Sequence, residues 1–279
     1  MFRYTYNTLV YGEEPITEGI ARVAGAGYDG VELVGEPAET NIGEVKSALA
    51  DNGVVASSIV SIYTPERDIV SSTEAVRTAA RDYVKGNIDF AQELGADIVT
   101  FTPTACMKIV AEVDLEQEWA WAVEAATELA RYAGQAGVKL VLEPWNRYET
   151  YLINRTEQAI RFIDEVDSPH LGYMADTFHM SLEERDIAES IRLAGSRLSH
   201  VHLADSNRAA PGFGHLDFEP IIQAIGDSNY EGWISYELLP AAGDVWGVLT
   251  GSGAPEFKGP YTEAAIRHTK AIEEKLGLR

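Results

Sequence analysis

Cysteine is nearly absent from this chain, because Cys106 is the only one in 279 residues. A single thiol cannot form a disulfide within the chain, so a small disulfide-stabilised fold is excluded. The first residues, MFRYTYNTLVYGEEP, also lack the basic start and the apolar stretch of a secretion signal. We therefore expect a cytoplasmic protein.

Basic residues are scarce as well: 22 Lys and Arg stand against 44 Asp and Glu, which gives a net charge of −22. Such a surface repels phosphate backbones at long range, so we expect no nucleic-acid partner. No run of apolar residues is long enough to span a membrane, so no membrane partner is expected either. The hydrophobic share of 46% is that of an ordinary globular protein.

Eight short segments rich in β-branched and apolar residues recur along the chain, and most of them follow a turn that contains glycine. They are residues 3–9, 30–35, 54–62, 97–103, 139–145, 171–178, 198–205 and 233–238. Segments with helical periodicity lie between them, and no long Pro/Gly/Ser linker divides the chain. This alternation predicts parallel strands joined by crossover helices. We expect residues 1–279 to form one (β/α)8 barrel. An open doubly wound sheet is the alternative, but the GxGxxG turn after its first strand is missing.

Residues 239–260, after the last predicted strand, form a long segment rich in glycine with Trp246 in its middle. We expect a loop here, on the face where the active sites of such barrels lie. It can serve as a lid or line the substrate pocket. It can equally be a subunit contact or an ordinary surface loop.

Four neighbouring predicted strands, the fifth to the eighth, end in residues that can bind a metal: Glu143, Asp176, His202 and Glu237. Alternate side chains of a strand point the same way, so each strand can send one such residue inward at a given layer. Each residue alone can be an ordinary polar residue at a strand end. Four together predict one divalent metal, because carboxylates clustered without a cation repel one another. Three carboxylates and one imidazole suit Mn²⁺, Co²⁺ or Mg²⁺ better than a structural zinc.

Two further polar residues are expected to point into the barrel. His200 precedes His202 by two residues and therefore faces the same interior, one layer deeper. We interpret it as a hydrogen-bonded core residue rather than a metal ligand. Glu32, on the second predicted strand, is either a similar inward-facing carboxylate or a substrate contact.

The stretches LEPWNRYET, ADTFHMSLEE, HVHLADSNRAAPGFGHLDF and ISYEL resemble the ketose 3-epimerases, the D-tagatose and D-psicose 3-epimerases of the xylose-isomerase-like barrel superfamily. The spacings of 33, 26 and 35 residues from Glu143 through Asp176 and His202 to Glu237 fit the metal-ligand pattern of that family. The resemblance covers the second half of the chain well and the first half only in outline.

This resemblance implies a metal-dependent sugar epimerase that inverts C3 of a ketose through a metal-stabilised enediolate. Glu143 and Glu237 would act as the acid/base pair as well as metal ligands. Glu149, His179 and Arg208 match the residues that hydrogen-bond the substrate around O1 and O2. The implied cofactor is one divalent ion, Mn²⁺ before Co²⁺ or Mg²⁺, and the implied assembly is a homodimer or homotetramer.

The chain also departs from the family pattern. LEPWN replaces the more usual LEVxN, and SNRAAPGFGHLDF is closer to the branch that acts on 3-keto sugars and 3-keto glycosides. The alternatives are therefore a 3-keto-glycoside epimerase or lyase, an aldose–ketose isomerase and an inosose dehydratase. A non-enzymatic sugar-binding barrel is disfavoured by the intact set of ligand residues.

Overall fold

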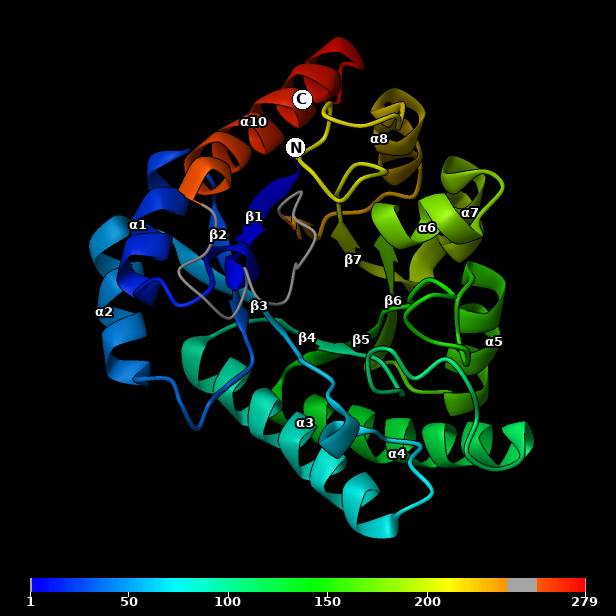
Figure 1. Cartoon of the computed structure of the whole chain (residues 1–279). Helices are drawn as coiled ribbons and strands as arrows, with labels where there is room; N and C mark the ends of the chain where they lie inside the picture. The colour runs from blue at the N-terminus through cyan, green and yellow to red at the C-terminus, as the bar shows by residue number, and fades with distance from the viewer. Residues whose placement is uncertain (1, 240–254, 279) are drawn as a thin grey trace.

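The computed structural model describes residues 2–239 and 255–278. Eight parallel strands close into a barrel in chain order, with β8 hydrogen-bonded to β1 (Figure 1). The strands are β1 (Arg3–Asn7), β2 (Gly30–Val34), β3 (Val55–Val60), β4 (Ile98–Phe101), β5 (Lys139–Leu142), β6 (Leu171–Asp176), β7 (Leu198–His202) and β8 (Trp233–Tyr236). Each lies inside a segment predicted from the sequence and ends one to three residues before it. The predicted (β/α)8 barrel is confirmed.

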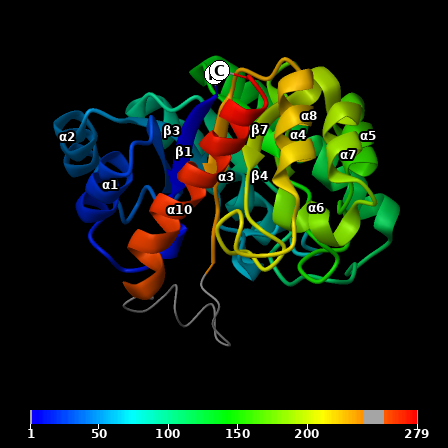
Figure 2. The same cartoon turned by 90° about the horizontal axis from the view of Figure 1, so that it is seen from above.

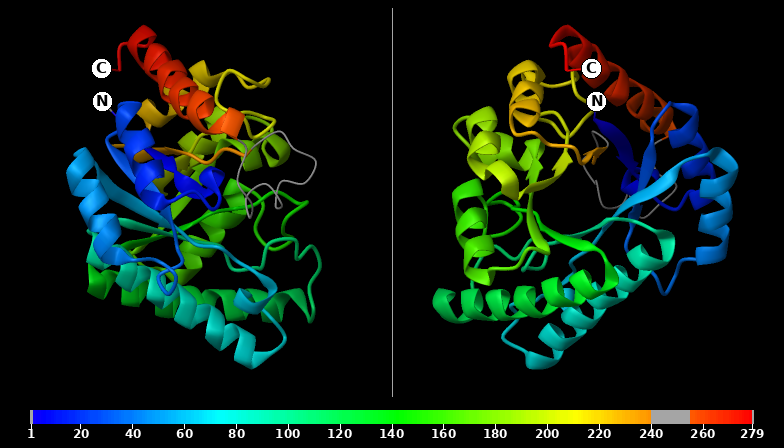
Figure 3. Two further views of the ribbon diagram at one scale, coloured as in Figure 1. Left: turned by 60° about the vertical axis from the view of Figure 1, so that its left-hand side comes forward. Right: turned by 180° about the vertical axis from the view of Figure 1, so that it is seen from behind.

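Helices surround the strands on all sides (Figure 3). They are α1 (Ile16–Gly25), α2 (Ile42–Asn52), α3 (Glu74–Leu94), α4 (Leu115–Ala136), α5 (Thr156–Val166), α6 (Thr177–Glu183), α7 (Ile187–Ala194), α8 (Phe218–Asp227) and α10 (Pro255–Lys275), with short 3₁₀ turns at η1 (Thr8–Tyr11), η2 (Pro65–Arg67) and η3 (Gly195–Arg197). None of the helices in the described ranges combines the length and apolarity of a membrane span.

The loop predicted over residues 239–260 extends too far, because α10 already begins at Pro255. Gly259 and Pro260 suggested a loop, yet tertiary packing outweighs their low helix propensity. Tyr261 is buried beside them, and Thr262 bonds the hydroxyl of Tyr11 at 2.7 Å. Residues 240–254, including Trp246, lie outside the described residues.

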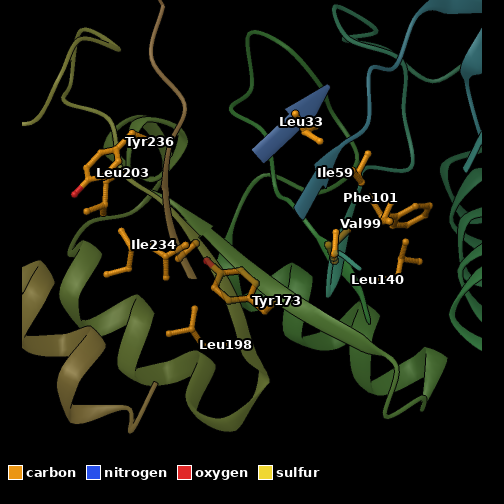
Figure 4. Close-up of a cluster of buried hydrophobic side chains, with 14 of the residues drawn as sticks. Leu33, Ile59, Val99, Phe101, Leu140, Tyr173, Leu198, Leu203, Ile234 and Tyr236 are labelled. Carbon is orange, nitrogen blue, oxygen red and sulfur yellow. The ribbon is translucent and has the colours of Figure 1, made fainter. Parts of the chain in front are cut away.

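The two faces of the barrel wall bury different kinds of side chain. Outward-facing residues such as Leu33, Ile59 and Val99 are apolar and pack beneath the helices (Figure 4). Inside, a small apolar cluster of Ile98, Val141, Met174 and Trp233 fills the part nearer the strands' N-terminal ends. Above it the interior is polar, with Thr5, Glu32, Ser58, His200 and Ser235 all buried. Buried polar groups are costly unless they are hydrogen-bonded, so this layer must be closely organised.

The two ends of the barrel are distinct. Both chain termini lie at one end, where the main-chain N–H of Phe2 donates to Glu273 of α10 at 3.2 Å (Figure 2). The loop of residues 203–217, yellow in the same view, lies at the other end. That end carries the loops that follow the strands, and the polar interior layer leads toward it.

Candidate active site

The four residues singled out at strand ends come together at the C-terminal end of the barrel. Glu143 follows β5 directly, Asp176 and His202 are the last residues of β6 and β7, and Glu237 follows β8. All four are buried, and their potential ligand atoms lie within 4.8 Å of one another. Because each of the four strands contributes one inward residue at its C-terminal end, the four side chains meet inside the barrel.

The geometry and the unpaired atoms of this cluster fit one metal ion. The Nδ1 of His202 is 3.7 Å from Asp176 Oδ2 and 3.9 Å from both Glu143 Oε1 and Glu237 Oε2. Two ligands that share an ion at about 2.1 Å are at most about 4.2 Å apart. In addition, Glu143 Oε1, Asp176 Oδ2 and His202 Nδ1 are buried without a hydrogen-bond partner. A cation between them would satisfy all three atoms.

The electrostatics of the cluster also favour a positive charge at this point. Burial raises the pKa of Glu143 well above its usual value, and the neighbouring Glu237 carboxylate raises it further. Burial lowers the pKa of His202, but Glu32, Asp176 and Glu237 more than reverse this and raise it well above its usual value. The carboxylates thus attract a proton to the place where a metal ion would neutralise them.

Of the two glutamates in the cluster, Arg208 contacts Glu237 and not Glu143. Its guanidinium donates to Glu237 Oε2 at 2.5 Å and to Glu149 Oε1 at 3.5 Å. The other oxygen of Glu237 accepts from the side-chain amide of Asn7 at 3.1 Å. Burial raises the pKa of Glu237, but Arg208 and His202 together outweigh burial and hold this pKa below its ordinary value. The two glutamates therefore lie in different surroundings, with Glu237 kept ionised.

His179, on α6, presents a neutral donor to the site. Its Nδ1 accepts the main-chain N–H of Asn146 at 3.1 Å, so the ring proton is on Nε2. That Nε2 lies 3.9 Å from Glu143 Oε1 and is buried without a hydrogen-bond partner. Burial lowers the pKa of His179 below its usual value. The side-chain amide of Asn146 donates to Glu149 at 2.8 Å and lies 2.8 Å from His179 Nδ1, so one side chain orients both residues.

A buried carboxylate lies directly beneath the cluster. Glu32 accepts from Ser58 and Ser235 at 2.7 Å each and bonds His200 Nε2 at 2.8 Å, which confirms the hydrogen-bonded core interpretation of His200. The Oε2 of Glu32, which accepts from Ser235, also lies 2.9 Å from His202 Nε2. Burial alone would raise the pKa of Glu32, but His202 and His200 hold it well below its usual value. With Glu32 on its Nε2 side, His202 turns Nδ1 toward the cluster.

Two residues of the site, Asn7 and Asn146, were not predicted from the sequence. Asn7 lies at the end of β1, in the half of the chain without a recognisable motif. Asn146 lies within LEPWNRYET, three residues before Glu149, and its place in that stretch could have identified it. Of the residues predicted to bind the substrate, His179 and Arg208 lie beside the cluster, and Glu149 is linked to it through Arg208 and Asn146.

Comparison with known proteins agrees with this arrangement. Residues 20–271 match the model of the xylose isomerase-like TIM barrel family. A D-psicose 3-epimerase from Ruminiclostridium cellulolyticum is 31% identical over 91% of each chain. A crystal structure of D-allulose 3-epimerase from Methylomonas sp. with D-allulose is 26% identical, covers 97% of each chain and gives a TM-score of 0.87. A 3-dehydro-D-guloside 4-epimerase from Escherichia coli is 28% identical over 80% of this chain and 87% of its own.

An eight-stranded barrel with a carboxylate-rich centre at its C-terminal end defines the general class, that of the xylose isomerase-like barrels. The chain belongs to this family and, within it, to the ketose 3-epimerases. It is therefore an enzyme of the isomerase class, as the resemblance implied.

Proposed function

We propose that this enzyme inverts the carbon beside the carbonyl of a keto sugar, with C3 of a ketose as the reacting centre. The observation that carries the proposal is the buried cluster of Glu143, Asp176, His202 and Glu237. Their potential ligand atoms lie within 4.8 Å of one another, and the first three residues each keep one of these atoms without a hydrogen-bond partner. The relatives named as ketose 3-epimerases support the same reaction.

We propose that these four residues bind one divalent ion, Mn²⁺ before Co²⁺ or Mg²⁺. Oxygen ligands with one imidazole suit these ions, and the described cluster offers no thiolate that would favour a structural zinc. When bound, the ion would act as a Lewis acid on the carbonyl and neighbouring hydroxyl oxygens of the sugar, whose adjacent C–H is otherwise too weakly acidic for a carboxylate.

Glu143 and Glu237 are the proposed acid/base pair, because they approach the common centre from different strands. One would remove the proton from one face of the sugar, and the other would return a proton to the opposite face. Arg208 supports this role because, together with His202, it favours the ionised form of Glu237. The Nε2–H of His179 and the carboxylate of Glu149 would hold the O1 and O2 oxygens of the substrate, and Arg208 would fix a hydroxyl.

The proposed substrate is a neutral sugar rather than a sugar phosphate. Arg208 is already paired with two carboxylates, so it is poorly suited to bind a phosphate as well. A second candidate is 4-epimerisation of a 3-keto glycoside. It is favoured by the Escherichia coli relative and by the segment SNRAAPGFGHLDF. Kinetics with D-fructose, fructose 6-phosphate and a 3-keto glucoside would rank these substrates by kcat/KM.

The decisive experiment follows the carbon-bound hydrogen by NMR in D₂O. Epimerisation should place solvent deuterium at the inverted carbon. Glu143→Gln and Glu237→Gln should each slow inversion in both directions by a factor of about 10²–10⁴. Glu157→Gln, at an exposed glutamate of α5, is the matched control and should behave as wild type. An epimer formed without solvent deuterium, or a Gln variant with near-native turnover, would refute the two-base assignment.

We also propose that the chain forms a homo-oligomer through an exposed apolar patch beside the site. The patch consists of Met107, Ile109, Val110, Val113, Leu115 and Tyr148. Exposed apolar patches mark interaction surfaces, and these side chains keep this character although Glu112 and Asp114 are exposed between them. Light scattering should find Val110→Glu monomeric at concentrations where wild type is a dimer or tetramer. An unchanged mass would place the contact elsewhere.

Two expectations remain, a cytoplasmic location and a single domain. The low cysteine content supports action in the cytoplasm. Closure of all eight strands into one barrel supports a single domain over residues 1–279, which limited proteolysis would test.

A further inference from the structure

We propose that Asp205 is a positioning residue, whose buried carboxylate fixes the main chain of residues 206–216 and thereby holds Arg208 against Glu237 and Glu149. Nothing in the ligand cluster requires Asp205, since it contacts none of the four residues there. The part of the proposal that concerns the substrate rests on the proposed function, whereas the part that concerns the loop does not.

The carboxylate of Asp205 collects main-chain donors from along the whole loop. Oδ1 accepts the N–H groups of Ser206 at 2.8 Å and Leu216 at 3.0 Å, and Oδ2 accepts that of Gly212 at 2.9 Å. The residue itself is 0% exposed. Burial raises its pKa, but these N–H groups reverse the effect and keep it below the ordinary value. Hydrogen bonds to an ionised acceptor are roughly twice as strong as neutral ones, so the charge itself holds the loop.

The space around Asp205 is shaped to receive this carboxylate. A Cβ added at Gly214 would lie 2.2 Å from Asp205 Oδ1, so any side chain there would displace it. Gly212, whose N–H donates to Oδ2, has φ +92°, a conformation that glycine adopts easily. The two glycines of PGFG thus allow the loop to wrap around one side chain.

Arg208 lies at the turn that Asp205 anchors. The main-chain N–H of Arg208 donates to the carbonyl of Asp205 at 2.8 Å, and the N–H of Asp205 donates to the carbonyl of Ala209 at 2.9 Å. The φ of Arg208 is +61°, in the left-handed region that residues with a side chain rarely adopt. Such a conformation persists only where the surroundings enforce it.

The left-handed turn directs the guanidinium into the site. It lies over the ring of Phe178 at 4.8 Å and reaches both Glu237 and Glu149. The outer side of the loop is open to solvent, with Asn207, Gly212, Phe213 and His215 exposed. Within the loop, the bonds to Asp205 therefore restrain where Arg208 points, and the N–H of Leu239 adds a bond to the Arg208 carbonyl at 2.9 Å.

Hydrogen exchange tests the loop directly. In wild type, the amides of Ser206, Gly212 and Leu216 should exchange at least tenfold more slowly than that of exposed Asn207. Asp205→Asn keeps the shape of the side chain but loses its charge and one acceptor, and should accelerate all three amides at least tenfold. Asp217→Asn is the matched control, because Asp217 only caps α8 through the N–H of Glu219 and asparagine caps equally well.

Kinetics test whether Asp205 acts through Arg208. Asp205→Asn should raise KM for the sugar about tenfold, lower kcat less and leave the Mn²⁺ content unchanged. In an Arg208→Ala background, the same change should add little to the loss in kcat/KM while still accelerating exchange. Additive losses in the double variant, or wild-type exchange in Asp205→Asn, would overturn the proposal.

Two outcomes separate this proposal from the proposed function. If wild type epimerises no keto sugar, the proposed function fails, and the exchange rates alone decide the role of Asp205. If Asp205→Asn does not fold, the wild-type amides still decide: fast exchange at Ser206, Gly212 and Leu216 would overturn the proposal.

Discussion

Strands β5 to β8 and strands β1 to β4 contribute different things to the same site. The later strands end in Glu143, Asp176, His202 and Glu237, the groups able to bind a metal. From the earlier strands come Asn7 and Glu32, each in contact with one of those four residues. These contacts are possible because the barrel closes, so that β1 lies beside β8 and inward side chains of β2 and β7 meet in the interior.

This difference shows that the groups able to bind a metal and the groups that contact them need not share a motif. The later strands end in four residues that can each bind a metal, and a reader of the sequence can recognise this pattern. Asn7 and Glu32 are single polar residues in otherwise unremarkable strands. Their partners lie 230 and 170 residues away, so only their contacts identify them.

A substitution on the later strands should have the largest effect on metal binding and activity. His202→Ala removes the single imidazole of the cluster, and we expect metal and activity to be lost together. The loss in metal affinity should exceed the about 10- to 100-fold cost of removing an outer hydrogen-bond partner of a ligand. Metal analysis after gel filtration, alongside turnover, checks this. Full metal occupancy in the variant would exclude His202 as a ligand.

A substitution on the earlier strands should have an intermediate effect on metal binding. Glu32→Gln keeps the size of the side chain but weakens the contact that turns His202 Nδ1 toward the cluster. We expect Mn²⁺ affinity to fall by about 10- to 100-fold, with the metal still bound at saturation. Calorimetric titration of the metal-free protein measures it, with exposed Glu39→Gln as the control. Unchanged affinity would mean that the earlier strands only fill space beneath the site.

The smallest expected effect lies outside the site and separates stability from catalysis. Half-buried Glu14 pairs with Arg22 of α1 and Lys258 of α10, both at 2.5 Å. Burial raises the pKa of Glu14, but Lys258 and Arg22 outweigh it, so this pKa lies below the usual value. Because the pKa of Glu14 is lower in the folded protein than in the unfolded chain, its ionised form stabilises the fold at pH values above about 4.3, the unfolded pKa. This stabilisation is lost as the pH falls through the pKa of the folded protein.

Glu14→Gln should therefore lower the free energy of unfolding by about 0.5–1 kcal/mol at pH 7. The difference from wild type should shrink as the pH falls below about 4. Urea unfolding at several pH values measures it, while kcat/KM at pH 7 should be unchanged. A difference that grows toward low pH would contradict the assignment of the charge.

The sequence by itself determined the barrel and the residues at its later strand ends. Strand and helix periodicities are local properties of the chain, and eight repeats of the pair leave few ways to bury the apolar faces. Side chains able to bind a metal at four successive strand ends must then meet, because parallel strands end on the same face. For this reason Glu143, Asp176, His202 and Glu237 could be grouped without coordinates.

Only the tertiary structure decided which groups orient that cluster. Asn7 reaches Glu237 because β8 closes against β1, and the left-handed turn of Arg208 depends on the buried carboxylate of Asp205. The start of α10 is set in the same way, since the packing of Tyr261 and Thr262 outweighs the local preference of Gly259 and Pro260. Each of these features depends on contacts between distant segments, and such contacts leave no periodic trace in the sequence.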